Sequence, residues 1–284
     1  MKRILYIIVV AVYAVSVCAQ GTYRMAGPYE VIARDGEHRN TKGGRERDMK
    51  ASLDYAIAWC ESQKKQEPGL QLLRNTELAN RYPNLPTLSP DSALKKSLEI
   101  INAYAGRLQR VDGHDAPLCL IQGYEMVLAM IELRDYRNSQ WDNMLRRAFV
   151  PTMQRFEADS PYANGNWGAI VNRMRMACAI LLNDSVMYNA SVDYFLHAND
   201  NGSLPHYIAP SGQCQETGRD QGHVQLGLEA LCQTCELAWR YKGDDLWGAL
   251  DNRLLKGVEY TACYNVGVEV PFETWNDCTG LYTL

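Results

Sequence analysis

The sequence predicts an all-α protein whose antiparallel helix pairs wrap into an (α/α) toroid or barrel, complete or incomplete. Apolar residues recur with the period of an amphipathic helix along most of the chain, and few stretches alternate as a strand would. Most connections between these stretches are short, which makes neighbouring helices antiparallel. A composition of 46% hydrophobic and 10% aromatic residues excludes intrinsic disorder.

Residues 1–19 have the pattern of a secretory signal peptide. Lys2 and Arg3 precede an apolar run that is too short to span a membrane, and small residues surround a cleavage point after Ala19. The mature chain is then one domain, residues 20–284, with no later membrane span. We expect it in the periplasm or secreted.

The mature chain is acidic. Without Lys2 and Arg3 it has 27 basic and 33 acidic residues, a net charge of −6. This balance excludes a broad basic surface, so no nucleic-acid partner is expected. An acidic polysaccharide or oligosaccharide would need a locally basic cleft. The polar segment 29–47, with Arg39, Lys42 and Arg45, is predicted to be a loop, either a solvated surface or a wall of such a cleft.

Eight helices follow from the apolar periodicity. Ser89-Pro90-Asp91 is a start signal before the second helix, and Lys242-Gly243 is a stop signal after the seventh. The expected helices span residues 48–63, 92–110, 119–135, 141–156, 166–183, 185–199, 219–241 and 245–265. The stretch 201–217 is rich in Gly, Pro and Ser and is predicted to be a loop, a common place for binding groups.

Eight cysteines remain after removal of the signal peptide, and an even count in an exported protein permits disulfides. Most of them lie in apolar helical stretches, where small buried thiols are the favoured interpretation. Cys232 and Cys235 have CxxC spacing, but no second pair or nearby His completes a zinc set. No metal or other cofactor is expected.

Two polar clusters lie where loops become helices. ANGNWG, residues 163–168, opens the fifth helix, and QETGRDQGH, residues 215–223, opens the seventh. Arg219 and His223 are four residues apart and therefore share one helix face. Singly, these residues are explained as turn, capping and core residues. Together, amides, an Arg, a His and a carboxylate at two helix starts indicate a binding or catalytic site.

Several runs resemble the alginate lyase family of polysaccharide lyases. They are NGNWGA at 164–169, ETGRDQGHVQLGLEAL at 216–231, DNRLLKGVEYTACYNVGVEVPFE at 251–273 and LEIINAYAGRLQRVDGHDAPL at 98–118. The resemblance extends over residues 28–284. It implies an (α/α) toroid that cleaves a uronic-acid-containing polysaccharide, alginate or a related polymer, by β-elimination.

This reaction defines the side chains that the site needs. The C5 proton of a uronate is only weakly acidic while the C6 carboxylate is charged, so donors must neutralise that carboxylate and the charge that develops on it. Asn and Arg supply such hydrogen bonds. A base removes the proton and an acid protonates the leaving oxygen, and His and Tyr are the usual side chains. The chemistry itself needs no metal.

The expected catalytic residues are Asn166, Arg219 and His223, of which the resemblance implies the first two, whereas His223 is chosen as the residue of this helix start that can titrate near neutral pH. Asn166 and Arg219 match donors to the substrate carboxylate, and His223 is assigned the role of base or of carboxylate neutralisation. The expected substrate-binding residues are Asn164, Trp167, Glu216, Gln221, Tyr260 and Tyr264.

Two positions depart from the family pattern. Trp167 occupies the place where better-known members have a His beside the Asn. About two turns after Arg219, where those members have a Tyr, this chain has Gln225-Leu226-Gly227. The identity of the acid and base therefore stays open, with Tyr260 and Tyr264 as further candidates or as packing residues.

Two other functions remain compatible with the sequence. The departures favour a catalytically inactive, carbohydrate-binding toroid. An inverting glycoside hydrolase would use separated carboxylates, for which Asp115, Glu216 and Asp220 are available. The sequence ends at Leu284, soon after the segment 269–271 beyond which family members continue, and this predicts a short form or a truncated chain with an open toroid.

Overall fold

The computed structural model describes Met25 and residues 29–32, 39–63, 89–112, 116–159, 165–277 and 280–282. Helices dominate these residues, which confirms the all-α class. The predictions for the signal peptide, for Asn164 and Asp115, and for the side chains of Arg39 and Lys42 lie outside what is described. Within the described part, no helix is both long and apolar enough to cross a membrane.

The structure has a helix at each of the eight predicted places. The helices are α2 (Arg39–Gln63), α4 (Pro90–Arg107), α5 (Ala116–Glu132), the 3₁₀ turn η3 (Arg134–Tyr136), α6 (Ser139–Met144), the π-helical turn η4 (Leu145–Phe149), α7 (Val150–Asp159), α8 (Gly165–Leu182), α9 (Ser185–His197), α10 (Leu204–Tyr207), α11 (Gln221–Lys242) and α12 (Ala249–Asn265). Two short sheets complete the described structure: β1 (Val31–Ile32) pairs in parallel with β2 (Arg110–Val111), and β3 (Trp275–Asp277) pairs antiparallel with β4 (Gly280–Tyr282).

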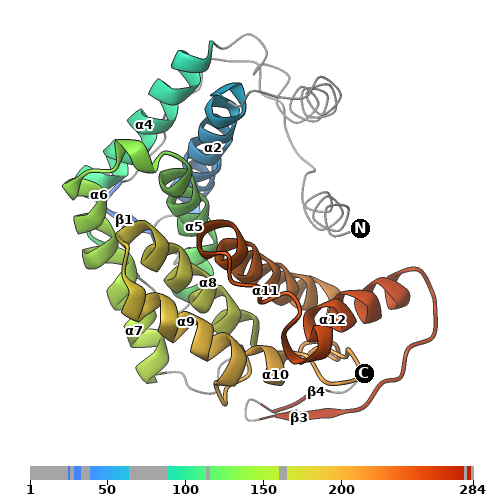
Figure 1. The fold of residues 1–284 in the computed structure, drawn as a ribbon. Helices are drawn as coiled ribbons and strands as arrows, with labels where there is room; N and C mark the ends of the chain where they lie inside the picture. Colours follow the sequence, from blue (N-terminus) through green and yellow to red (C-terminus); the bar gives the residue numbers. More distant parts are fainter. Residues whose placement is uncertain are drawn as a thin grey trace.

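The helices form two layers that follow an arc (Figure 1). The inner layer is α2, α5, α8 and α11, each packed against the next. The outer layer contains α4 on α2, the run of α6, η4 and α7 beside α5 and α8, α9 on α8, and α12 on α11. Inner and outer helices alternate along the chain.

The four inner helices run in the same direction. Near the starts of α2 and α5, Gln122 Nε2 donates to Glu46 Oε1 at 2.6 Å, and near their ends Cys60 Sγ lies 3.6 Å from Glu132 O. Near the ends of α5 and α11, Arg240 Nη2 donates to Glu132 Oε2 at 3.1 Å. Helix α8 contacts α11 midway, where Arg173 Nη1 donates to Gln233 Oε1, and its start lies beside the segment that leads into α11, where the Gly165 backbone N–H donates to Gln215 Oε1. The starts of the inner helices therefore lie along one rim of the arc and their ends along the other.

The segment predicted to be a loop before residue 48 is partly helical, so that prediction was wrong for residues 39–47. Helix α2 begins at Arg39, and the side chain of Arg45 is fully buried, which also contradicts a solvated surface there. The two glycines at positions 43 and 44 disfavour a helix in isolation. Packing of α2 against α4 and α5 stabilises the helix nevertheless, because tertiary contacts supply most helical stability in proteins.

The segment 201–217 is mostly irregular, as predicted. It contains the single turn α10 and an isolated bridge between Ile208 and Cys214. The expected burial of cysteines is also observed: Cys119, Cys178, Cys214 and Cys235 are each at most 1% exposed. Burial raises the pKa of the Cys178 and Cys214 thiols to about 12, which makes them unreactive.

Candidate active site

The starts of α8 and α11 meet through the loop that precedes α11. Tyr207, fully buried at the end of α10, donates its hydroxyl toward the carbonyl oxygens of His223 and Val224, each 3.2 Å away. From the same loop, Gln215 Oε1 accepts a hydrogen bond from the Gly165 backbone N–H at 3.0 Å. The two polar clusters of the sequence therefore open neighbouring inner helices on one rim.

Two glycines allow this close approach. A Cβ atom on Gly165 would lie 2.3 Å from Asn201 O, and one on Gly227 would lie 2.0 Å from the Tyr207 hydroxyl. Gly227 is one of the positions where the family pattern would place a Tyr. In this chain the phenol ring of Tyr207, supplied by the loop, occupies the space beside that position.

Asn166, in the first turn of α8, is fully buried. Neither its Oδ1 nor its Nδ2 has a hydrogen-bond partner among the described residues. An unpaired buried polar group costs about 1–3 kcal/mol, so such groups are uncommon and need an explanation. The unpaired amide lies at the rim, but the side chain is closed to solvent, so a ligand reaches it only if the rim opens.

Arg219 is held at the rim by Glu216. The Glu216 side chain is fully buried and accepts a hydrogen bond from Arg219 Nη1 at 3.3 Å, whereas the Arg219 side chain is 33% exposed. Burial raises the pKa of Glu216, and the charge of Arg219 opposes that rise. Glu216, predicted from the sequence to bind substrate, is thus placed behind the guanidinium, which faces outward.

His223 is joined to Asp220 by two hydrogen bonds. Asp220 is the N-cap of α11, and its Oδ1 accepts from the His223 backbone N–H at 2.9 Å. Its Oδ2 lies 2.6 Å from His223 Nδ1 and 3.9 Å from Arg219 Nε. The sequence suggested Asp220 only as a capping residue or as a carboxylate of a hydrolase. The contact with the imidazole was missed.

The remaining predicted residues lie around this rim or on α12. Trp167 is half-buried at the start of α8. Gln221 Oε1 accepts from Asn265 Nδ2 at 3.0 Å, which links the start of α11 to the end of α12. Tyr260 is 6% exposed and donates its hydroxyl to Pro271 O at 2.7 Å, whereas Tyr264 is 52% exposed. The contact of Tyr260 gives it a packing role, and Tyr264 faces solvent.

A group of charged side chains lies farther along the inner helices. Arg173, on α8, follows Asn166 by seven residues and so lies on the same helix face. It is 1% exposed, and its guanidinium lies 4.1 Å from the centre of the Tyr124 ring. Burial lowers the pKa of Arg173 and raises that of nearby Glu125 to about 7. The sequence did not indicate these residues because each lies within an apolar helical stretch.

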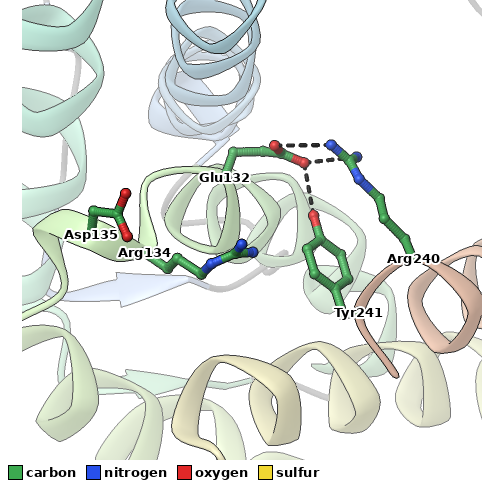
Figure 2. A pocket seen from close by; sticks show the side chains of 5 residues that line it. All are labelled: Glu132, Arg134, Asp135, Arg240 and Tyr241. Carbon is green, nitrogen blue, oxygen red and sulfur yellow. Dashed lines mark hydrogen bonds and ion pairs between the residues drawn. The ribbon is translucent and has the colours of Figure 1, made fainter. Parts of the chain in front are cut away.

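The pocket in Figure 2 lies at the ends of α5 and α11, away from the rim where the two polar clusters meet. Its volume is about 220 Å³ and its lining residues are Glu132, Arg134, Asp135, Arg240 and Tyr241. The Glu132 carboxylate accepts hydrogen bonds from Arg240 Nη2 at 3.1 Å and from the Tyr241 hydroxyl at 2.8 Å. These bonds tie the end of α5 to the end of α11. None of the residues predicted for the site lines this pocket.

The described residues contain no group of three His, Cys, Asp or Glu side chains close enough to hold a metal ion.

Comparison with known proteins identifies the class. The family profile described as Alginate lyase matches residues 120–272, more than half of the chain, so the protein belongs to the alginate lyase family. No curated protein and no solved structure matches the chain. The matched range contains both helix starts, and family membership supports a function of the polysaccharide-lyase type.

Proposed function

We propose that this protein is a polysaccharide lyase that cleaves a uronic-acid-containing polysaccharide, alginate or a related polymer, by β-elimination. The observation that carries the proposal is the meeting of the two polar clusters at adjacent helix starts, through Tyr207 and Gln215. Asn166, Arg219 and His223 belong to those two clusters. They supply the donors and the titratable group that elimination from a uronate needs.

Arg219 is the side chain at this rim that suits an acidic sugar, although Glu216 and Asp220 lie beside it and the whole chain is acidic. The starts of α8 and α11 carry the positive ends of two helix dipoles, which favour bound anions. Arg219 adds a partly exposed guanidinium. A guanidinium matches a carboxylate with two parallel hydrogen bonds, which a lysine cannot do. The C6 carboxylate of a uronate is therefore the group that we assign to this position.

Each of these residues has a separate proposed role in the reaction. Arg219 binds the C6 carboxylate, Asn166 joins it when the rim opens, and both stabilise the negative charge that builds up on it when C5 loses its proton. Glu216 holds Arg219 in place from the buried side. His223 is the titratable group on the exposed side of the same helix start, at 35% side-chain exposure. Trp167, half-buried beside Asn166, is proposed to contact the sugar ring.

We also propose that the two-layered arc is part of an (α/α) toroid. The alternation of inner and outer helices and the common direction of the inner ones support this arrangement. Export to the periplasm or the exterior is proposed from the signal-peptide pattern of residues 1–19.

A second candidate is a carbohydrate-binding protein without catalytic activity. It is favoured by two observations at the rim: Trp167 replaces the motif His, and Tyr207 is buried and bonded to backbone carbonyls beside Gly227. Such a protein would bind a polyuronate at the same rim and leave it intact.

The experiment is an elimination assay with matched variants. Purified protein is incubated with alginate, and the ultraviolet absorbance of the unsaturated uronate product is followed. His223→Ala should lower the rate by a factor of about 10² to 10⁴, the contribution of a positioned general base. Arg219→Lys should also be impaired, because it keeps the charge but loses the bidentate geometry. A folded His223→Ala variant with the unmodified rate would show that the base lies elsewhere, and binding without product would favour the second candidate.

A further inference from the structure

We infer that Asp220 is a positioning residue that fixes the tautomer of His223, so that the imidazole removes the C5 proton through Nε2. This inference rests on the proposed function, and it chooses between the two roles left open for His223, base and carboxylate neutralisation. It is carried by the geometry of one carboxylate that serves both the backbone and the side chain of the same histidine.

The carboxylate of Asp220 is anchored by the helix itself. As the N-cap of α11 it has extended backbone angles, φ −170° and ψ 160°, and its Oδ1 accepts from the His223 backbone N–H at 2.9 Å. This bond satisfies one of the free N–H groups at the helix start. The second oxygen, Oδ2, is thereby held 2.6 Å from His223 Nδ1. The carboxylate that caps the helix through Oδ1 therefore also orients the imidazole ring through Oδ2.

The protonation of the pair determines the tautomer. Although burial acts against it, the two hydrogen bonds from His223 and the charge of Arg219 lower the pKa of Asp220. The carboxylate is therefore ionised near neutral pH and can only accept hydrogen bonds. The hydrogen in the contact must then lie on Nδ1 of the imidazole. A neutral ring with its hydrogen on Nδ1 has its free electron pair on Nε2, which is the nitrogen that can take a proton.

The position of Arg219 agrees with this role. In a uronate, C5 is bonded directly to the carboxyl carbon C6, so a base for the C5 proton must lie close to the group that binds the carboxylate. Asp220 Oδ2 lies 3.9 Å from Arg219 Nε as well as 2.6 Å from the imidazole. One carboxylate thus places the base beside the guanidinium. Both side chains are about one-third exposed and accessible to a sugar.

The elimination step is balanced in its bonds and protons. The C5–H bond breaks and its proton forms a bond to Nε2 of His223. The electron pair becomes the C4=C5 double bond, and the bond from C4 to the glycosidic oxygen breaks. The leaving oxygen takes a proton from solvent water, and the imidazolium returns one proton to solvent, so no water is consumed. Ionised Asp220 stabilises the imidazolium while it exists.

The test compares Asp220→Asn with a matched control, Asp184→Asn, in the full chain. Asn caps a helix as well as Asp does, so neither variant should lose stability. Asp184 caps α9 by accepting from the Met187 backbone N–H at 2.9 Å, as Asp220 caps α11, and its side chain makes that contact without a histidine partner. At position 220 an amide can offer an N–H to Nδ1, which favours the opposite tautomer.

Two measurements are made on each protein: the imidazole ¹⁵N chemical shifts, which report the tautomer, and kcat and KM on alginate. We expect the unmodified His223 to carry its hydrogen on Nδ1. In Asp220→Asn the hydrogen should move to Nε2, with a loss of about a hundredfold in kcat, at the lower end of what a positioned base contributes, and little change in KM. Asp184→Asn should match the unmodified protein in both measurements.

Three results would overturn the inference: a hydrogen on Nε2 in the unmodified protein, an unchanged tautomer in Asp220→Asn, or equal losses of kcat in the two variants. A failure of the proposed function is distinguishable from these. If the unmodified protein forms no unsaturated product, the lyase proposal fails, while the tautomer measured in the two variants still decides whether Asp220 directs Nε2 outward.

Discussion

Replacing Glu125 by Gln should make the stability of the protein less sensitive to pH. Glu125 lies on the inner helix α5, where burial raises its pKa from an ordinary 4.5 to about 7. The charges that act on it come from two neighbouring helices and one farther along the layer. Lys50 of α2 and Arg173 of α8 lower the pKa, whereas Asp54 of α2 and Glu229 of α11 raise it. Burial exceeds the net effect of these charges.

The direction and size of the effect follow from the two pKa values. In the unfolded chain Glu125 ionises near pH 4.5, but in the folded protein it holds its proton up to about pH 7. The folded state therefore loses stability as pH rises between these values, and the loss is complete above the higher one. A difference of about 2.5 corresponds to ~3 kcal/mol as an upper limit, since each pKa unit is 1.36 kcal/mol. Gln resembles the protonated side chain and avoids this loss.

The assay is urea denaturation of both proteins on either side of this window. Near pH 4 the variant and the unmodified protein should be about equally stable, and near pH 8 the variant should be more stable by up to ~3 kcal/mol. Glu99→Gln, on the exposed side of α4, serves as control and should show the same small difference at both pH values. A difference for Glu125→Gln that is the same at both pH values would refute the reasoning.

Two further predictions concern the core. Tyr207→Phe removes the hydroxyl that bonds to the carbonyls of His223 and Val224, so it should lower the free energy of unfolding by about 1 kcal/mol in the urea denaturation assay. Tyr136→Phe, which changes a 40% exposed ring, is the control and should alter the free energy of unfolding little. Thiol-specific alkylation should be slow in the native protein, because burial suppresses the thiolate of residues such as Cys178. After denaturation without reductant, the same reagent should label most of the eight mature thiols. Four intact disulfides in the denatured sample would contradict the second prediction.

The order and extent of the helices could be read from the sequence because apolar periodicity is a local property. The start of α8, one residue from its predicted position, shows how well this works for a long apolar helix. The start of α2 was missed because its first turns contain glycines and charges, and contacts with other helices stabilise them. In α12, Leu250, Asp251 and Asn252 have positive φ values of 50°, 59° and 55°, so its regular helix begins later than predicted.

The sequence indicated which two segments of the chain form the candidate site. Polar residues at two helix starts indicated where to look, since both starts belong to helices on the inner layer. The partners of each side chain were not predictable. Glu216 with Arg219 and Asp220 with His223 are local pairs, each three residues apart, but the sequence does not show that Glu216 is buried behind the guanidinium or that Asp220 contacts the imidazole as well as the backbone. The contact between Tyr207 and the start of α11 is equally hidden, because it joins residues from two segments.

Elimination and hydrolysis of a polyuronate leave different chain ends. The most direct measurement is mass spectrometry of the oligosaccharides released from alginate, together with their ultraviolet absorbance. Elimination predicts new chain ends that carry a C4=C5 double bond and that are lighter by one water than hydrolysis products, with both signals lost in His223→Ala. Products of full hydrolytic mass without the absorbance would contradict it and point to a hydrolase, and bound but uncut alginate would point to a binding protein.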